Sequence, residues 1–227
     1  MPRSVVTLDE DGAQHFPGCF SSATMTTLEA RLGDVDTGRA GIRISAAPRL
    51  VDWLAEAGVT ELVSDRMASH ARPVRSILFD KTADANWALG WHQDRTIVVT
   101  RRAEVDGFGR WSRKRGLTHV EPPFSIIEAM ITARIHLDPA PIDNAPLLIA
   151  PGSHRAGRIS ESEIGAVAAQ CGTFTCLAGR GDLWLYRTAI VHRSTATTSL
   201  GRRRVLQVDF SAEVLPEPLQ WLGLAEL

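Results

Sequence analysis

Cysteine and lysine are both scarce in this chain of 227 residues, and each scarcity argues against a class of protein. The three cysteines, Cys19, Cys171 and Cys176, are an odd number without C-x-x-C spacing. They argue against a disulfide framework or a cysteine-rich zinc site and favour reduced thiols in a cytoplasmic protein. Lys81 and Lys114 are the only lysines, and the net charge is -1. The chain therefore lacks the overall positive charge that would predict a nucleic-acid or anionic-membrane partner.

Long apolar runs are absent as well. No run approaches the length of a membrane span, and the first residues, MPRSVVTLDEDG, are acidic where a signal peptide has its apolar stretch. The chain has no internal repeat, low-complexity tract or long Pro/Gly/Ser linker. Its length and its 44% of hydrophobic residues suit one domain with a sizeable core. We therefore expect a cytoplasmic protein with a single domain over residues 1–227 and no membrane partner.

Helical spacing dominates the first third, about residues 1–73. The segment SSATMTTLEARLGDV has a serine cap and places Met25, Leu28 and Leu32 on one helical face. The segment APRLVDWLAEAGVTELVSDRM repeats this spacing and is interrupted near Gly58. This part of the chain predicts a helical flank.

The pattern changes at about residue 74 to short apolar runs bounded by Gly, Pro, Asp and Asn, and this continues to residue 227. One helix interrupts the runs at ISESEIGAVAAQ, where Ser160 and Glu163 have capping-box spacing. Helices followed by many short strands predict a mainly β fold, a sandwich or barrel with flanking N-terminal helices. The runs interpreted as strands are VRSILFDK, RTIVVTR, ITARIHLD, APLLIAPGSH, GTFTCLAG, GDLWLYRTAIVH and RRRVLQVDFS.

Residues 101–124 show little strand character between two of these runs. A loop of this length inside a compact domain is usually functional or mobile, so we expect a lid over the site. The alternative is an ordinary solvated loop. Its excess of positive charge would favour an anionic substrate. The charged residues are Arg101, Arg102, Arg110, Arg113, Lys114 and Arg115 against Glu104, Asp106 and Glu121.

The stretch GWHQDRTIVV, residues 90–99, places two polar side chains before a β-branched run. In a strand, residues i and i+2 share a face, so His92 and Asp94 would point to the same side. His192, at the end of the run GDLWLYRTAIVH, is the best candidate for a third metal ligand. Two histidines and one carboxylate on one face of an octahedral ion are typical of non-haem Fe(II) oxygenases. An H-x-D pair also occurs by chance, as the polar face of an exposed edge.

An arginine stands near the head of the last predicted strand. Alternation along RRVLQVDFS places Arg203 and Gln207 on one face, while the other face is apolar and can pack on the helices. An arginine near a metal is well suited to a bidentate grip on a carboxylate. A bulge or a slip of one residue would turn Arg202 or Arg204 inward instead.

Taken in order, these motifs resemble a known family. The pattern WHQD, RIHLD, NAPLLIAPGSH, GDLWLYRTAIVHRS and RRRVLQVDFS is similar to the phytanoyl-CoA dioxygenase family of Fe(II)- and 2-oxoglutarate-dependent oxygenases. The resemblance runs from about Arg75 to the C-terminus, includes LPEPLQW, and is loose in the helical first third.

The resemblance implies a double-stranded β-helix, the cupin-like jelly roll, with Fe(II) held by His92, Asp94 and His192. It implies that Arg203 pairs with the distal carboxylate of the co-substrate 2-oxoglutarate and that the Ser194 hydroxyl assists. Dioxygen is the second co-substrate, and succinate is a product. Related halogenases have a small residue in place of the carboxylate ligand, so the presence of Asp94 favours oxygenation.

Other polar residues near the predicted strands are candidates for the pocket. Lys81, on the strand that also carries Arg75, would bind the co-substrate, although a solvated edge explains both residues equally well. His136 alternates with Arg134 and either lines the cavity or is a satisfied core histidine. His154, in the turn PGSH, competes for ligand status but is more typical of a hydrogen-bonding turn residue. The predicted substrate-binding residues are Arg134, His136, Trp91 and Arg95, with Asn86 and Trp87 as residues that could shape the pocket.

We therefore expect an Fe(II)- and 2-oxoglutarate-dependent oxygenase that hydroxylates a small organic molecule. One alternative is a non-catalytic jelly-roll binding module, against which the intact set of histidines and aspartate argues. The other is a cupin-like metalloenzyme that does not use 2-oxoglutarate, in which Arg203 would have no explanation.

Overall fold

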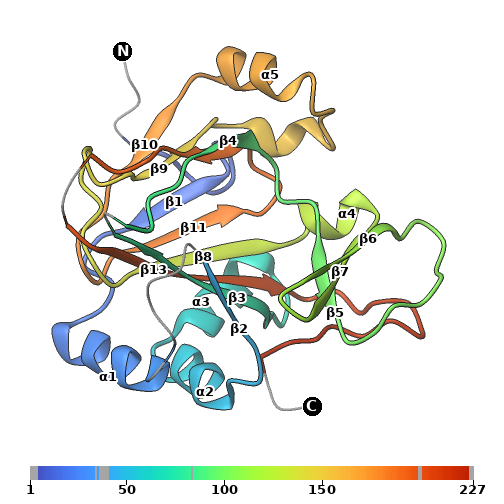
Figure 1. Ribbon diagram of the computed structural model, residues 1–227, viewed down its shortest axis with the longest axis horizontal. Helices are drawn as coiled ribbons and strands as arrows, with labels where there is room; N and C mark the ends of the chain where they lie inside the picture. The colour runs from blue at the N-terminus through green and yellow to red at the C-terminus, as the bar shows by residue number, and fades with distance from the viewer. Residues whose placement is uncertain (1–4, 34, 36–40, 83, 199–200, 225–227) are drawn as a thin grey trace.

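Two antiparallel sheets face each other and form the body of the fold (Figure 1). The computed structural model describes residues 5–33, 35, 41–82, 84–198 and 201–224. The larger sheet contains, in spatial order, β1 (Ala13–Phe16), β11 (Leu183–Arg187), β8 (Ile131–His136), β13 (Arg203–Ser211), β3 (Arg72–Lys81) and β2 (Ile42–Ile44). The smaller sheet contains β10 (Phe174–Cys176), β9 (Leu147–Ile149), β12 (His192–Ser194) and β4 (Leu89–His92). The mainly β fold is confirmed.

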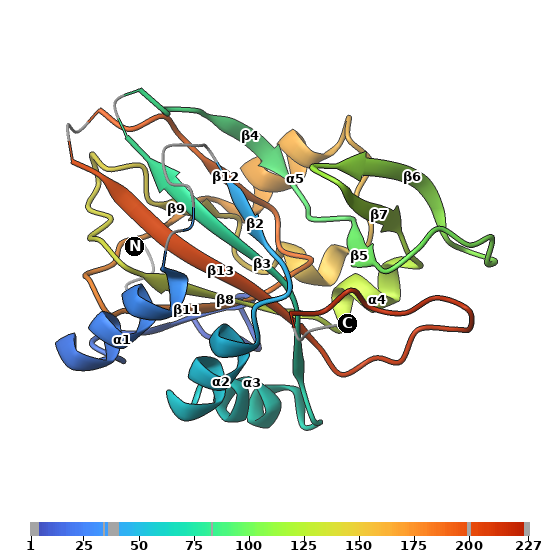
Figure 2. The same ribbon diagram turned by 60° about the horizontal axis from the view of Figure 1, so that its bottom comes forward.

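Three helices cover the outer face of the larger sheet: α1 (Ser22–Leu32), α2 (Pro48–Glu56) and α3 (Val59–Met67) (Figure 2). Ser21 caps α1 by accepting a hydrogen bond from the Thr24 amide at 3.1 Å, as its sequence predicted. Gly58, with φ of 76°, is the N-cap residue of α3 and stands where the helical spacing of the sequence is interrupted. The predicted flank is helical, but the same third of the chain also supplies the edge strands β1 and β2.

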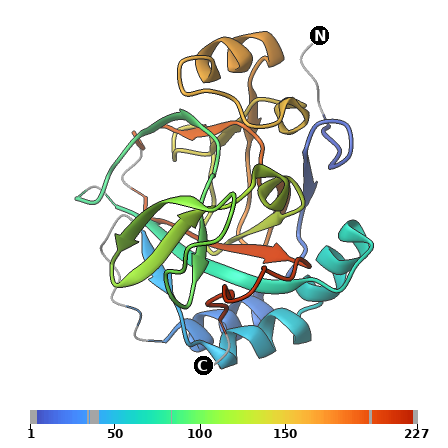
Figure 3. The same ribbon diagram turned by 90° about the vertical axis from the view of Figure 1, so that its right-hand side faces the viewer.

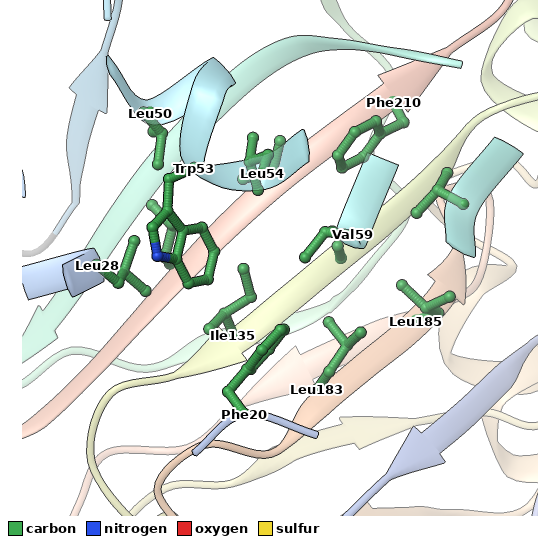
Figure 4. Close-up of a cluster of buried hydrophobic side chains, with 14 of the residues drawn as sticks. Phe20, Leu28, Leu50, Trp53, Leu54, Val59, Ile135, Leu183, Leu185 and Phe210 are labelled. Atoms are coloured by element: carbon green, nitrogen blue, oxygen red, sulfur yellow. The ribbon is translucent and has the colours of Figure 1, made fainter. Parts of the chain in front are cut away.

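The helices and the sheet meet in a large apolar core (Figure 4). Trp53 of α2 is 1% exposed, and its indole nitrogen donates to the Thr27 hydroxyl at 3.0 Å. Strand β13 contributes its apolar face to this core, as alternation predicted, while Arg203 and Gln207 on the opposite face point between the two sheets. The core therefore fixes which residues of β13 face the interior of the β-helix. Its buried members include Leu28, Leu50, Leu54, Val59, Ile135, Leu183, Leu206, Val208 and Phe210.

The prediction of a loop over residues 101–124 holds for residues 101–108 but was wrong for residues 109–121. These residues contain β6 (Gly109–Lys114) and β7 (Leu117–Glu121), a hairpin that pairs with β5 (Ile97–Val99) in a three-stranded sheet (Figure 3). Its turn has Arg115 and Gly116 at its centre, both with positive φ, which is the geometry of a two-residue hairpin turn. The strands are polar and only partly buried, so they lack the apolar alternation that reveals a strand in the sequence. A short helix, α4 (Phe124–Glu128), follows.

Two further boundaries differ from the sequence prediction. The run GDLWLYRTAIVH is not one strand, because a turn at residues 188–191 carries the chain from β11 in the larger sheet to β12 in the smaller one. His192 therefore begins a strand. The helix α5 (Ile164–Cys171) forms without the predicted capping box, since the Ser160 hydroxyl donates to the Glu163 carboxylate and accepts no hydrogen bond from a backbone amide of the helix. A 3-10 turn over Ser153–Ala156 precedes it.

A membrane-spanning helix is not found in the described part of the chain, where no helix is both long and apolar enough to cross a bilayer.

Candidate metal centre

Two histidines face each other across the smaller sheet. His92 and His192 are register partners in the β4–β12 pair, with ring centroids 4.2 Å apart. The Nδ1 atom of His92 lies 2.8 Å from the Gly90 carbonyl oxygen, and that of His192 lies 3.0 Å from the Ile190 oxygen. Because a carbonyl oxygen only accepts, each Nδ1 carries the hydrogen and each Nε2 keeps its lone pair. Both rings are therefore held in the tautomer that binds a metal ion through Nε2.

Asp94 completes the group. One carboxylate oxygen of Asp94 and one nitrogen from each histidine all lie within 4.8 Å of one another. The sequence predicted that His92 and Asp94 share a face through strand alternation. Strand β4 ends at His92, however, so Asp94 reaches the histidines from the segment that follows the strand. In the described part of the chain this is the only group of three such side chains that could hold a metal ion, and His154 lies outside it.

Arg75 sets the charge state of Asp94. Its Nη2 lies 3.4 Å from Asp94 Oδ2, and its Nε donates to the fully buried Asp209. Burial alone would raise the pKa of Asp94, but the charge of the Arg75 guanidinium opposes this, and that pKa lies below its ordinary value. Burial lowers the pKa of His192 to about 4, so its ring is neutral at neutral pH. Imidazole nitrogens and an ionised carboxylate are a suitable donor set for Fe(II).

A cavity of about 280 Å³ opens beside this group. It is lined by the inner face of the larger sheet, the smaller sheet and the β6–β7 hairpin. Trp87 lines the cavity, whereas the Asn86 side chain bonds to the backbone of Thr197 at 2.8 and 2.9 Å. The other predicted residues in its lining are Arg75, His92, Asp94, Arg134, His192, Ser194 and Arg203.

Arg203 lies in the cavity wall with only 2% of its surface exposed. One guanidinium nitrogen donates to a backbone carbonyl at 2.8 Å, while its Nε is buried without a partner among the described residues. Burial, then the neighbouring Arg134, lowers the pKa of Arg203 to about 9. The adjacent Arg202 and Arg204 are engaged elsewhere, in two-pronged ion pairs at 2.8 Å with Asp80 and Asp138. Of the three consecutive arginines, Arg203 is the one in the cavity.

Lys81 lies behind the cavity wall rather than in it. The amine is fully buried and donates to the Ser194 hydroxyl at 3.1 Å and to two backbone carbonyls. Ser194 itself lines the cavity. Burial, then Arg203 and Arg134, lowers the pKa of Lys81 to about 7. Lys81 is thus placed to orient the Ser194 hydroxyl and not to touch a molecule in the cavity.

Arg134 adds a second buried guanidinium to the cavity. Its Nη1 donates to the Gln207 side-chain oxygen at 3.0 Å, and the same oxygen accepts from the Tyr186 hydroxyl at 3.1 Å. The guanidinium carbon lies 5.3 Å from the centre of the Phe79 ring. Within the described residues, no carboxylate forms an ion pair with Arg134 or Arg203.

Three predicted substrate-binding residues lie outside the cavity lining. His136 is 1% exposed, and burial lowers its pKa well below the ordinary value. Trp91 packs beneath the Arg193 guanidinium, 4.8 Å from the ring centre. Arg95 donates to the backbone carbonyl of Ile159.

Several cavity residues escaped the sequence reasoning. Arg193 directly follows a predicted ligand, and that position was a usable signal. Arg43 and His119 reach the cavity through the pairing of β2 with β3 and of β7 with β5. Such long-range pairings leave no local pattern, so no signal in the sequence could have found these two.

Two facing antiparallel sheets with a His/Asp/His group beside the cavity between them define a double-stranded β-helix protein with a candidate non-haem iron centre. The sequence profile of the family described as Phytanoyl-CoA dioxygenase matches residues 8–205. The chain therefore belongs to the phytanoyl-CoA dioxygenase family and is an enzyme of the 2-oxoglutarate-dependent non-haem iron oxygenase class. No curated protein matches the chain significantly.

Solved structures of low sequence identity share the fold. EctD from S. alaskensis, with 2-oxoglutarate and 5-hydroxyectoine, is 16% identical with a TM-score of 0.68, covering 90% of this chain and 73% of EctD. The carbocyclase SnoK from nogalamycin biosynthesis is 18% identical with a TM-score of 0.65, covering 90% and 81%. HygX from Streptomyces hygroscopicus, with nickel, 2-oxoglutarate and hygromycin B, is 16% identical with a TM-score of 0.61, covering 92% and 86%. At these identities the likeness establishes the double-stranded β-helix alone.

Proposed function

We propose that this protein is an Fe(II)- and 2-oxoglutarate-dependent hydroxylase of a small organic molecule, with succinate and carbon dioxide as co-products. The observation that carries the proposal is the His92/Asp94/His192 group beside a cavity that also contains the unneutralised Arg203. A metal site alone would not need this second feature.

The three ligand side chains fit iron in charge and in tautomer. Both histidines present Nε2 because their Nδ1 atoms are bound to backbone carbonyls, and Asp94 is kept ionised by Arg75. Three protein ligands on one side of an octahedral ion leave positions for other molecules. When bound there, iron and 2-oxoglutarate would supply the oxidation of a C–H bond by dioxygen.

The cavity also fits 2-oxoglutarate. Arg203 offers a planar pair of donors to a distal carboxylate, and its buried Nε has no partner among the described residues. The Ser194 hydroxyl, oriented by Lys81, lines the same cavity. Two proteins of the same fold, EctD and HygX, were crystallised with 2-oxoglutarate, which supports the assignment.

The alternative functions explain less of this arrangement. A non-catalytic binding module has no need for two fixed histidine tautomers around an ionised carboxylate. A metalloenzyme without 2-oxoglutarate leaves the buried Arg203 charge without a partner, at a considerable desolvation cost. Proteins of the same fold include a carbocyclase and an epimerase, both from nogalamycin biosynthesis. Among the oxidations that this class of enzyme carries out, we propose hydroxylation. Halogenation is disfavoured because Asp94 occupies the position where related halogenases have a small residue.

The test is succinate formation from 2-oxoglutarate by the iron-loaded protein under air, with and without a panel of small metabolites. We expect slow succinate formation without a metabolite and faster succinate formation with a substrate. The hydroxylated product should contain one oxygen atom more than the substrate. His92→Ala and Asp94→Ala should abolish turnover while thermal unfolding stays cooperative. Asp94→Glu should also fail, because a displacement of about 1 Å exceeds the tolerance of a preorganised site. Full activity in the alanine variants would contradict the assignment of the metal ligands.

A further inference from the structure

The cavity carries far more positive charge than the proposed co-substrate can neutralise. Six of its lining residues are arginine or lysine, and Asp94 is the one carboxylate among the described lining residues. Iron and the dianion 2-oxoglutarate would cancel each other, so their binding leaves this excess unchanged. The basic lining residues are Arg43, Arg75, Lys114, Arg134, Arg193 and Arg203.

Some of these cations already have a partner or a proposed one. Arg75 is paired with Asp94 and Asp209, and Arg203 is proposed to hold the distal carboxylate of 2-oxoglutarate. Arg134 donates to the Gln207 oxygen. Of the remaining cations, Arg193 lies on β12 over the Trp91 ring, whereas Arg43 and Lys114 lie on the edge strand β2 and on the hairpin. Among the described residues, no carboxylate forms an ion pair with any of these three.

Arg43, Lys114 and His119 converge on this part of the cavity from three different strands. His119 of β7 is 1% exposed, its Nδ1 donates to the Leu117 carbonyl at 3.1 Å, and its Nε2 is buried without a partner among the described residues. The Nε of Arg43, on β2, is also buried and without a partner in that part of the chain. Lys114, on β6, supplies an exposed amine at the cavity edge.

The titration behaviour of these groups agrees with their geometry. Burial lowers the pKa of His119 to about 4, with Arg43, Arg75 and Lys114 as further causes. Burial, then Arg75 and Arg115, lowers the pKa of Arg43. Positive groups thus repel one another here, and a bound oxyanion would relieve the repulsion. It would also favour the protonated form of His119, whose Nε2–H could then donate to the anion.

The proposed co-substrate cannot serve both ends of the cavity. Arg43 pairs with Ile77 along β3, whereas Arg203 pairs with Lys81 of the same strand. Four residues of strand separate the two positions by roughly 13 Å. A 2-oxoglutarate molecule held by Arg203 and by the metal has no charge left for Arg43.

We infer that the substrate carries an oxyanion, a carboxylate or a phosphate, which binds to Arg43, Lys114 and His119. The inference rests on the proposed function, since it describes the second organic molecule in the same cavity. The inference also assigns a substrate-binding function to the hairpin, because Lys114 lies on β6 and His119 on β7.

The test is a titration of the nickel-loaded protein, saturated with 2-oxoglutarate at fixed ionic strength, with phenyl phosphate, benzoate and the neutral benzyl alcohol. We expect at least one anion to bind tenfold or more tightly than the alcohol, and the better anion identifies the group. Arg43→Gln and Lys114→Gln should each weaken that binding by about tenfold or more, because each removes a charge-assisted hydrogen bond.

Arg113→Gln is the matched control, since Arg113 neighbours Lys114 but is exposed and bonds to the Gly116 carbonyl. It should leave anion affinity unchanged. Equal affinity for anions and alcohol, or no binding of any probe, would overturn the inference, as would a loss in Arg193→Gln with none in Arg43→Gln. If 2-oxoglutarate itself fails to bind, the proposed function is contradicted, and the same probes on the nickel-loaded protein still decide the anion site.

Discussion

Arg75 and Asp94 form an ion pair at 3.4 Å, and the same guanidinium also binds the buried Asp209. Asp209 in turn accepts from the Thr132 hydroxyl at 2.9 Å. The candidate iron ligand is therefore connected to the interior of the larger sheet through a single arginine. This arrangement predicts that metal affinity and stability depend on the same side chain.

Arg75→Gln should lower Fe(II) affinity by about 10- to 100-fold, as the loss of outer partners of metal ligands commonly does. It should also lower the free energy of unfolding by about 3–5 kcal/mol, because Asp209 keeps a buried charge without its partner. Adding Asp209→Asn should recover much of the stability and none of the metal affinity. Metal titration and chemical denaturation measure the two effects, and an unchanged metal affinity would contradict the role given to Arg75.

The residues of β13 show what the sequence could predict. Alternation placed Arg203 in the cavity and Leu206 in the helical core, and both positions are confirmed. Period-two alternation is reliable here because one face of the strand meets an apolar core and the other a polar cavity. The two candidate histidine ligands, His92 and His192, lie on the short strands β4 and β12.

The β6–β7 hairpin and Arg43 show what the sequence could not predict. The hairpin is polar and partly exposed, so its strands carry no apolar pattern, and only the turn at Arg115 and Gly116 marks them. Arg43 reaches the site because β2 pairs with β3, and no local feature specifies that partner. Asp94 was predicted for the wrong reason, because β4 ends before it.

The role of the β6–β7 hairpin as a lid stays a prediction. A substitution in its turn tests whether this wall of the cavity contributes to ligand binding. Gly116 has φ of 83° with no atom within 4 Å of an added Cβ, so Gly116→Ala adds backbone strain and no clash. Such strain costs about 1 kcal/mol or more. Amide hydrogen exchange should become faster in β6 and β7, and anion binding should weaken. Gly165→Ala in α5 is the control, because helical alanine is preferred there and should not destabilise. Equal exchange rates in both variants would argue against a strained turn.

His119 predicts a loss of stability in acid. Its pKa is about 4 in the folded protein, whereas an unfolded chain would have the ordinary value of about 6.5. Between these pH values the unfolded chain binds more protons, so the free energy of unfolding falls as the pH falls, by up to about 3 kcal/mol from this residue. His119→Gln should make the profile of stability between pH 4 and 6.5 less steep, and His136, also buried, should account for part of the remaining slope. His70→Gln, at an exposed histidine, serves as the control for the substitution itself.

We expect Lys81 to affect the binding of 2-oxoglutarate without touching it. Because its amine holds the Ser194 hydroxyl at 3.1 Å from behind the cavity wall, Lys81→Met should leave that hydroxyl free to rotate. We expect the KM for 2-oxoglutarate to rise by about threefold to tenfold, in line with the loss of one hydrogen bond of about 0.5–1.5 kcal/mol, with little change in kcat. Ser194→Ala should give a similar rise, and the double variant should add little to it. Additive losses would indicate that the two residues act separately.

Arg203 gives the sharpest test, because folding and binding should respond in opposite directions. In the absence of ligand its guanidinium is a buried cation with no carboxylate partner among the described residues, which costs desolvation energy. Arg203→Met keeps much of the side-chain volume and removes that charge, so the ligand-free protein should unfold at the same or a higher denaturant concentration. Binding of 2-oxoglutarate to the same variant should weaken by about 30-fold to several thousand-fold, because a buried charge-assisted pair is broken.

Arg203→Lys should recover only part of the affinity, since an ammonium lacks the planar pair of donors. Arg202→Ala should show the reverse behaviour, with lower stability because it leaves the buried Asp80 without this ion pair, and unchanged affinity for 2-oxoglutarate. Iron affinity should stay nearly constant in all three variants, which separates co-substrate binding from metal binding. If Arg202→Ala lost 2-oxoglutarate and Arg203→Met retained it, the carboxylate would lie on the other face of β13, and the assignment of the co-substrate site would be wrong.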